Sequence, residues 1–184
     1  MTKKLFYPKL AAVNIRKNGK FYMPYILICT LAAAMFYDIL FLASNHGLEN
    51  MQRGTDSIRI IMFLGTIVVG IFSVVLLFYT NSFIMKCRQK EIGLYNILGM
   101  EKRHLGRMMF FETVFIAAFS IIAGILTGIL FSKLLILILT KLMRSDIVLG
   151  FEVNPSALLI TAVLFSAIFL IILIYNLIKV RLSK

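Results

Sequence analysis

The stretch KCRQKEIGLYNILGMEKRHLGRMMFFE, residues 86–112, separates two long apolar runs of the chain. It contains six of the twenty Lys and Arg residues, yet its middle, IGLYNILGM, is almost as apolar as the runs on either side. Lys and Arg collect in the loops that stay on the cytoplasmic side of a membrane. The stretch therefore predicts a cytoplasmic loop that joins two membrane helices.

The composition of the whole chain agrees with a membrane location. The mean hydropathy of the 184 residues is +0.93, and only 15% of them are charged, against roughly a quarter in an ordinary soluble domain. The net charge of +12 does not indicate nucleic-acid binding, because the basic residues cluster at the ends of apolar segments. We therefore expect an integral membrane protein in contact with the lipid bilayer and not with nucleic acid.

Four apolar runs are long enough to cross a bilayer core of roughly 30 Å, which takes about 20 helical residues. They cover residues 23–43, 58–85, 110–139 and 157–178. The first run follows a long basic segment and has no small-residue cleavage site after it, so we expect a retained anchor and not a signal peptide. The sequence predicts an all-α protein with four transmembrane helices.

The distribution of Lys and Arg predicts the orientation of these helices. Fifteen of the twenty basic residues lie in segments 1–22, 86–109 and 179–184, and five lie on the opposite side. The excess of basic residues marks the cytoplasmic side. Both termini and the 86–109 loop are therefore predicted in the cytoplasm.

Within the N-terminal segment, Leu10, Val13 and Asn14 fall one helical turn apart, with basic residues on their flanks. This spacing fits an amphipathic helix that lies in the cytoplasmic headgroup layer. A plain positively charged tail that anchors the topology explains the composition equally well.

No motif of a soluble enzyme is present. The chain has no phosphate-binding GxxxxGK[ST] loop and no HExxH or paired-cysteine metal pattern. His46 and His104 are predicted on opposite faces of the membrane, so they cannot share a metal ion. An intramembrane enzyme built on Asp38, Glu112 and His46 is disfavoured for the same reason. We predict no catalytic residue, no metal site and no cofactor in this chain.

Two carboxylates lie within apolar runs. Asp38 is an intramembrane charge, which is a functional hypothesis by default, but it lies near the outer end of its run. There it can reach water or pair with Arg59 or Lys133, and this structural interpretation is the favoured one. Glu112 is predicted in the first turn of the third helix, where an acid complements the helix dipole.

A stripe of small residues runs along the third predicted helix at intervals of four: Ser120, Gly124, Gly128 and Ser132. Such a stripe lets another helix backbone approach closely. Its partner, within this chain or in another, is left open by the sequence.

The apolar middle of the basic loop has helical spacing of its own. One side of a short helix carries Ile92, Tyr95 and Gly99, with Leu94 and Leu98 beside them, while Gly93 and Gly99 disfavour a long continuous helix. Such a helix can lie flat on the membrane or present apolar anchors to a cytosolic partner. Periodicity alone does not decide between these two roles.

The stretch RQKEIGLYNILGMEKRHLGRMMFFE, residues 88–112, resembles the signature loop of FtsX/MacB-type ABC transporter permeases. The matching positions are Arg88, Glu91, Ile92, Gly93, Leu94, Leu98, Gly99 and Glu112. The N-terminal KLAAVNIRKNGKFYMPY, residues 9–25, is similar to the first part of bacitracin-resistance (Bce-type) permeases. MacB-like members carry a large domain between their first two helices, which the short segment 44–57 excludes.

The resemblance implies four parts: an N-terminal segment 1–22, a first transmembrane helix 23–43, an FtsX-like three-helix unit 58–178 and a cytoplasmic tail 179–184. It further implies that a separate cytosolic ATPase, which binds ATP and magnesium, docks on the helix at 91–100. The coupling residues would be Arg88, Glu91, Ile92, Gly93, Leu94, Tyr95, Leu98, Gly99 and Glu112.

Bce-type permeases act in antimicrobial-peptide resistance and often work with a sensor histidine kinase. They are also longer, with a second FtsX-like unit, so a further permease half or a second copy is an expected partner. The alternative is a membrane adaptor that transports nothing and regulates a cell-wall hydrolase or a sensor kinase through the same loop.

Overall fold

The structure is a computed structural model that describes residues 6–44, 55–89, 93–94, 102–143 and 154–182. The long elements in these ranges are all α-helices: α1 (Phe6–Lys17), α2 (Gly19–Ala43), α3 (Thr55–Cys87), α5 (Lys102–Met143) and α6 (Pro155–Leu182). Of these, α2, α3, α5 and α6 are long and apolar enough to cross a membrane. The predicted all-helical architecture with four membrane-length helices is confirmed.

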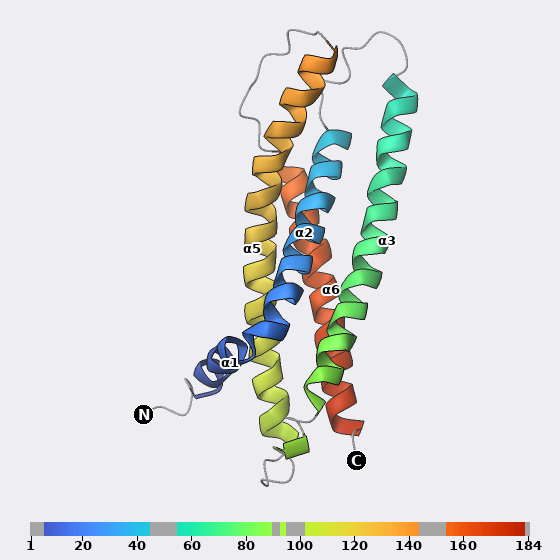
Figure 1. Ribbon diagram of the computed structural model, residues 1–184. Helices are drawn as coiled ribbons and strands as arrows, with labels where there is room; N and C mark the ends of the chain where they lie inside the picture. The colour runs from blue at the N-terminus through green and yellow to red at the C-terminus, as the bar shows by residue number, and fades with distance from the viewer. Residues whose placement is uncertain (1–5, 45–54, 90–92, 95–101, 144–153, 183–184) are drawn as a thin grey trace.

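The four long helices run side by side along the length of the molecule, and α1 lies across them at one end (Figure 1). We call this the α1 end of the bundle; α3 and α6 finish there and α5 begins there. The chain bends between α1 and α2 at Asn18, which has φ −100° and ψ 27°. Asn and Gly are poor helix formers, so the pair Asn18–Gly19 is a natural place for two helices to separate.

The observed helices extend beyond the apolar runs. The largest difference is in α5, which has 42 residues and is therefore roughly 60 Å long at 1.5 Å per residue. It begins eight residues before the predicted run. The extra turns form because Leu105, Met108 and Met109 are buried together with Met85 and Val180. Tertiary packing thus continues the helix through a basic region that hydropathy alone excludes.

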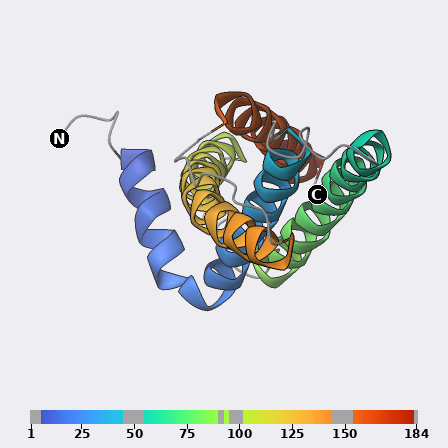
Figure 2. The same ribbon diagram turned by 90° about the horizontal axis from the view of Figure 1, so that it is seen from above.

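Helix α2 lies at the centre of the bundle, between α3, α5 and α6 (Figure 2). In its most apolar window 39% of the residues are buried, against 17% in α3. The core around it contains Cys29, Phe36, Leu77, Phe165 and Ile172. The rest of the apolar surface faces outward, as expected for helices that contact lipid.

The close approach of α5 to α2 depends on two glycines of the small-residue stripe. A Cβ atom on Gly124 would lie 2.6 Å from Cβ of Ala33, and one on Gly128 would lie 2.8 Å from Cδ1 of Tyr37. Ser120 and Ser132 of the same stripe are also buried. The partner of the stripe is therefore α2 of the same chain.

At the opposite end of the bundle, Asn154 caps α6 and ties it to α2. Its Oδ1 accepts a hydrogen bond from the backbone N–H of Ser156 at 3.1 Å, and its Nδ2 donates to Oγ of Ser44 at 2.8 Å. Asn is a preferred N-cap residue because its side chain satisfies a free backbone donor. The following Pro155 is the first residue of α6, a position at which proline is favoured because it lacks the N–H that would be unpaired there.

Candidate functional site

A buried ion pair joins the two ends of the basic segment. Nη1 of Arg88 lies 2.5 Å from Oε2 of Glu112, and Nη2 lies 3.2 Å from Oε1. The relative exposures of the two side chains are only 4% and 3%. The two residues are 24 positions apart in the chain. Their contact therefore holds together the two ends of the segment that connects α3 to α5.

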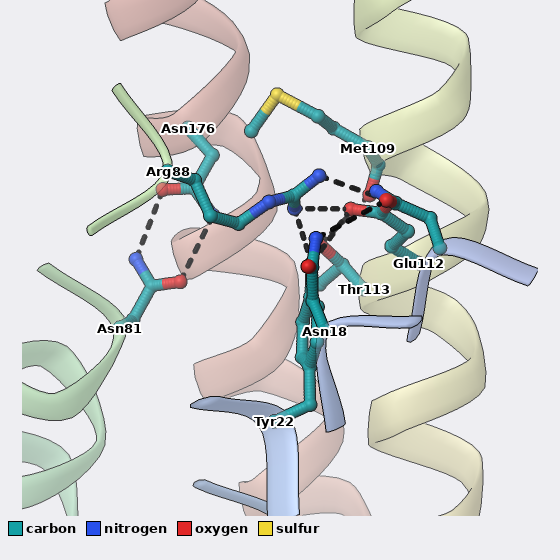
Figure 3. Close-up of polar contacts among 9 residues, drawn as sticks. Asn18, Tyr22, Asn81, Arg88, Met109, Glu112, Thr113 and Asn176 are labelled. Atoms are coloured by element: carbon teal, nitrogen blue, oxygen red, sulfur yellow. Dashed lines mark hydrogen bonds and ion pairs between the residues drawn. The ribbon is translucent and has the colours of Figure 1, made fainter. Parts of the chain in front are cut away.

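The carboxylate of Glu112 also accepts hydrogen bonds from α1 and α2. Nδ2 of Asn14 donates to Oε1 at 2.5 Å, and the hydroxyl of Tyr22 donates to Oε2 at 3.0 Å. Figure 3 shows the side chains of Tyr22 on α2, Glu112 on α5 and Arg88, which directly follows α3, pointing toward one another. With Asn14, the cluster joins α1, α2, the end of α3 and α5.

The guanidinium of Arg88 is held on a second side by Tyr22. Its Nη1 donates a hydrogen bond to the hydroxyl of Tyr22, and its Cζ lies 5.3 Å from the centre of the tyrosine ring. Asn18, at the bend before α2, donates from Nδ2 to Oδ1 of Asn14 at 3.3 Å. Buried charges require both an opposite charge and hydrogen bonds. This set supplies the opposite charge and hydrogen bonds to both Nη atoms of Arg88, while Nε of Arg88 donates no hydrogen bond to any described residue.

The position of Glu112 corrects one prediction. The sequence places Glu112 in the first helical turn, but α5 begins at Lys102, so the carboxylate lies in its third turn. At that depth the backbone N–H groups are already bonded within the helix, and the helix dipole no longer explains the residue. The acid is there to balance Arg88.

A second polar contact, which the sequence analysis does not identify, joins α3 to α6. The side-chain amides of Asn81 and Asn176 exchange hydrogen bonds of 2.9 and 3.0 Å, and both residues are buried. Figure 3 shows this pair near Arg88. An amide inside an apolar run is a signal for such interhelical bonds, so both residues could have been singled out from the sequence.

The remaining candidate residues are placed as follows. Glu91, Ile92, Tyr95, Leu98 and Gly99 of the coupling segment lie outside the described residues. Gly93 and Leu94 are helical, and the Leu94 side chain is 57% exposed. The coupling residues that the structure brings together are therefore Arg88 and Glu112.

In α1, Leu10 packs against the cluster of Met85, Leu105 and Met108, and Asn14 reaches Glu112. Val13 is 54% exposed, although it is predicted on the same face. The helix thus packs its Leu10 and Asn14 side against the bundle.

Asp38 is buried in α2, near the end of the bundle opposite α1. Its Oδ1 accepts no hydrogen bond from any residue that the structure describes. The pairing of Asp38 with Lys133 stays a prediction. The side chain of Arg59, the other predicted partner, lies outside the described part.

Within the described ranges, the structure contains no group of three or more His, Cys, Asp or Glu residues that could hold a metal ion. The buried polar cluster described above is built on the Arg88–Glu112 ion pair, which lies where the segment between α3 and α5 meets these two helices. This arrangement defines a multi-pass helical membrane protein whose basic segment is fastened to several helices at once.

Comparison with known proteins identifies the family. Residues 59–183 match the FtsX-like permease C-terminal family, which is more than half of the chain. The chain therefore belongs to the FtsX-like permeases and is a multi-pass protein of the cytoplasmic membrane.

Individual relatives are ABC transporter permeases. The chain is 30% identical over 173 residues to the uncharacterized ABC transporter permease YvcS of Bacillus subtilis strain 168. The aligned residues make up 94% of this chain and 27% of the relative. It is 30% identical over 168 residues to the bacitracin export permease protein BceB of the same organism, covering 89% of this chain and 25% of the relative. The BceB of Halalkalibacterium halodurans is 29% identical over 168 residues, 91% of this chain and 26% of the relative. The chain spans about a quarter of the length of these relatives.

Proposed function

We propose that the chain is a membrane-spanning permease part of an ABC transporter, driven by a separate cytosolic ATPase through residues 88–112. The observation that carries the proposal is the buried Arg88–Glu112 pair. It fastens both ends of the basic segment to α1, α2, α3 and α5 at one point. A force applied to the segment would therefore act on four helices together.

The orientation that this function requires is N-in and C-in. It is supported by the fifteen basic residues in segments 1–22, 86–109 and 179–184 and by the common position of α1, the start of α5 and the end of α6 in Figure 1. In this orientation the coupling segment faces the cytoplasm, where an ATPase binds ATP and magnesium. No nucleotide chemistry takes place on the permease itself.

In the proposed mechanism the ATPase binds the segment 91–100, which the sequence predicts to be a short helix, and displaces it during its nucleotide cycle. Leu94, the described apolar side chain of this segment, is exposed and would serve as one anchor; Ile92, Tyr95 and Leu98 would be the others. The ion pair then passes the displacement to α3 and α5. Because these helices also contact α2, the whole bundle responds.

The biological role of this helix movement is proposed from the names of the relatives. Two of them are named bacitracin export permeases, which supports a role in antimicrobial-peptide resistance or export. The chain spans about a quarter of their length, so we expect it to act with a further permease half or a second copy. A sensor histidine kinase is a further proposed partner, on the family resemblance alone.

Co-purification from membranes with ABC-type ATPase subunits, identified by mass spectrometry, tests the docking role. Leu94→Asp should reduce the amount of co-purified ATPase severalfold, and the triple change of Ile92, Tyr95 and Leu98 to Asp should abolish it. Val13→Asp is a matched control, because Val13 is exposed to a similar extent, 54% against 57%, but lies on α1. Undiminished ATPase binding by the triple variant would show that the segment does not couple.

A further inference from the structure

A groove separates the beginning of α5 from the end of α6. Its volume is about 590 Å³, which is within the usual range for ligand sites. It is open in part because Gly106 has no side chain; a Cβ there would lie 3.4 Å from Cδ2 of Leu177. Its lining includes Arg103, Gly106, Arg107 and Phe110 of α5 and Leu177 and Ile178 of α6.

One side of this groove is positively charged. Arg103 and Arg107 are one helical turn apart, so their side chains emerge on the same face of α5, and both are exposed. Neither forms an ion pair with a carboxylate in the described ranges, where the buried pair is formed by Arg88 and Glu112. Arg107 instead lies with its Cζ 5.7 Å from the centre of the Tyr7 ring. The N-terminus of α5, one residue before Arg103, adds the positive end of a helix dipole.

The other side of the groove is apolar and lies at membrane depth. Phe110, Leu177 and Ile178 line it, and they belong to the stretches Arg103–Ile138 and Pro155–Val180 that are apolar enough to span the bilayer. The arginines are at the very end of the first stretch. The groove therefore passes from hydrocarbon to headgroup level over two turns of helix.

A free phosphate ion would use the arginines but would gain nothing from the apolar wall. An acyl chain alone would fill the wall and leave two cations without a counter-charge. A ligand with both parts satisfies both sides, and basic pockets between membrane helices are known to take anionic lipid headgroups. Net negative charge is favoured over a zwitterionic headgroup, because the second guanidinium then also finds a counter-charge.

We propose that this groove binds an anionic phospholipid, with its phosphate on Arg103 and Arg107 and an acyl chain against Phe110, Leu177 and Ile178. The bound lipid would fill the space between α5 and α6 beside the coupling segment. Lipid binding at this groove needs no ATPase partner. A test of lipid binding is therefore independent of whether the chain is driven by an ATPase.

Native mass spectrometry of the purified chain, with dioleoyl phosphatidylglycerol added in detergent, measures this binding. Arg103→Gln with Arg107→Gln should weaken binding roughly 30-fold, since each basic residue near anionic lipid contributes about a factor of five. Arg103→Lys with Arg107→Lys should keep most of the affinity, because lysine still binds phosphate as a point charge. The matched control removes two exposed charges from α1, Arg16→Gln with Lys17→Gln, and should bind like the wild type.

Two further ligands separate the sources of the phosphate. Dioleoyl phosphatidylcholine should bind at least about 10-fold more weakly than phosphatidylglycerol, and inorganic phosphate should not displace the lipid at equal concentration. Equal binding of phosphatidylcholine would overturn selection by charge, and displacement by inorganic phosphate would overturn the lipid assignment. Unchanged lipid binding by the folded Arg103→Gln/Arg107→Gln variant would overturn the site itself.

Discussion

Arg88 and Glu112 each carry a full charge, and the surrounding helices exclude water from both side chains. Desolvating two charges is costly, and their mutual attraction offsets that cost only when the remaining hydrogen-bonding groups are satisfied. Asn14 and Tyr22 supply those hydrogen bonds to Glu112. Such a pair is therefore weak evidence for added stability. Removing only one of its two charges, however, strongly destabilises the fold, because the other charge stays buried without a partner.

The first prediction concerns the loss of either charge. Arg88→Met or Glu112→Gln should each lower the free energy of unfolding by about 3–5 kcal/mol, because the other charge is left buried and unbalanced. The double variant should lose clearly less than the sum, by at least about 2 kcal/mol, since no buried charge remains. Reversible unfolding in mixed micelles, followed by circular dichroism, measures all three values.

Arg16→Met is the control for this series, because Arg16 is exposed on α1. Its effect should stay within about 0.5 kcal/mol. If the Arg88 and Glu112 effects simply added, the two side chains would not act as a pair, and the fastening of the coupling segment would lose its basis.

At the scale of elements, the contact between α2 and α5 is set by glycine. In a membrane, helices gain little from hiding apolar surface, so close van der Waals packing is what holds them together. Gly124 meets backbone and side-chain atoms of α2: an added Cβ would lie 2.6 Å from Cβ of Ala33 and 3.0 Å from the carbonyl oxygen of Thr30. Neither neighbour can move without shifting a helix.

The second prediction compares one chemical change at two sites. Gly124→Ala should lower the free energy of unfolding by about 1–3 kcal/mol through overpacking. Gly65→Ala adds the same methyl group to α3, where the nearest atom, Cγ2 of Ile39, is 4.0 Å away. There the change should be neutral or stabilising by up to about 1 kcal/mol, because alanine favours a helix. Equal effects in the same unfolding assay would contradict close packing at Gly124.

At the scale of the whole molecule, α3 is the least enclosed membrane helix, with 17% of its apolar window buried. Large side chains such as Phe63, Phe72 and Tyr79 point away from the bundle. Lipid covers such a face without difficulty.

The third prediction concerns orientation, and it uses single cysteines in a chain with Cys29→Ser and Cys87→Ser. Thr2→Cys and Ser183→Cys should resist a membrane-impermeant maleimide in intact cells and react after permeabilisation. Asn50→Cys should react in both conditions, because segment 44–57 follows the first membrane helix. The reverse labelling pattern would place the coupling segment outside and exclude a cytosolic ATPase partner.

How far the sequence alone reaches depends on whether a property is local. The lengths of four apolar runs predict four membrane helices because a span needs only enough consecutive apolar residues. Likewise the basic residues of segments 1–22 and 86–109 predict an orientation without any knowledge of packing. The motif at 88–112 points to the family, which the match over 59–183 confirms.

The tertiary structure decided what brings distant residues together. Glu112 follows a local rule for helix starts in the sequence, but it pairs with Arg88 because α5 is extended by packing and α3 ends beside it. Asn14 joins that pair because the chain bends at Asn18 and lays α1 against α5, and Tyr22 joins it because α2 packs against α5. Pairing between residues 24 positions apart depends on how whole helices pack, so the local sequence gives no signal for it. Hydropathy and charge are read from consecutive residues and therefore do not predict which distant side chains meet.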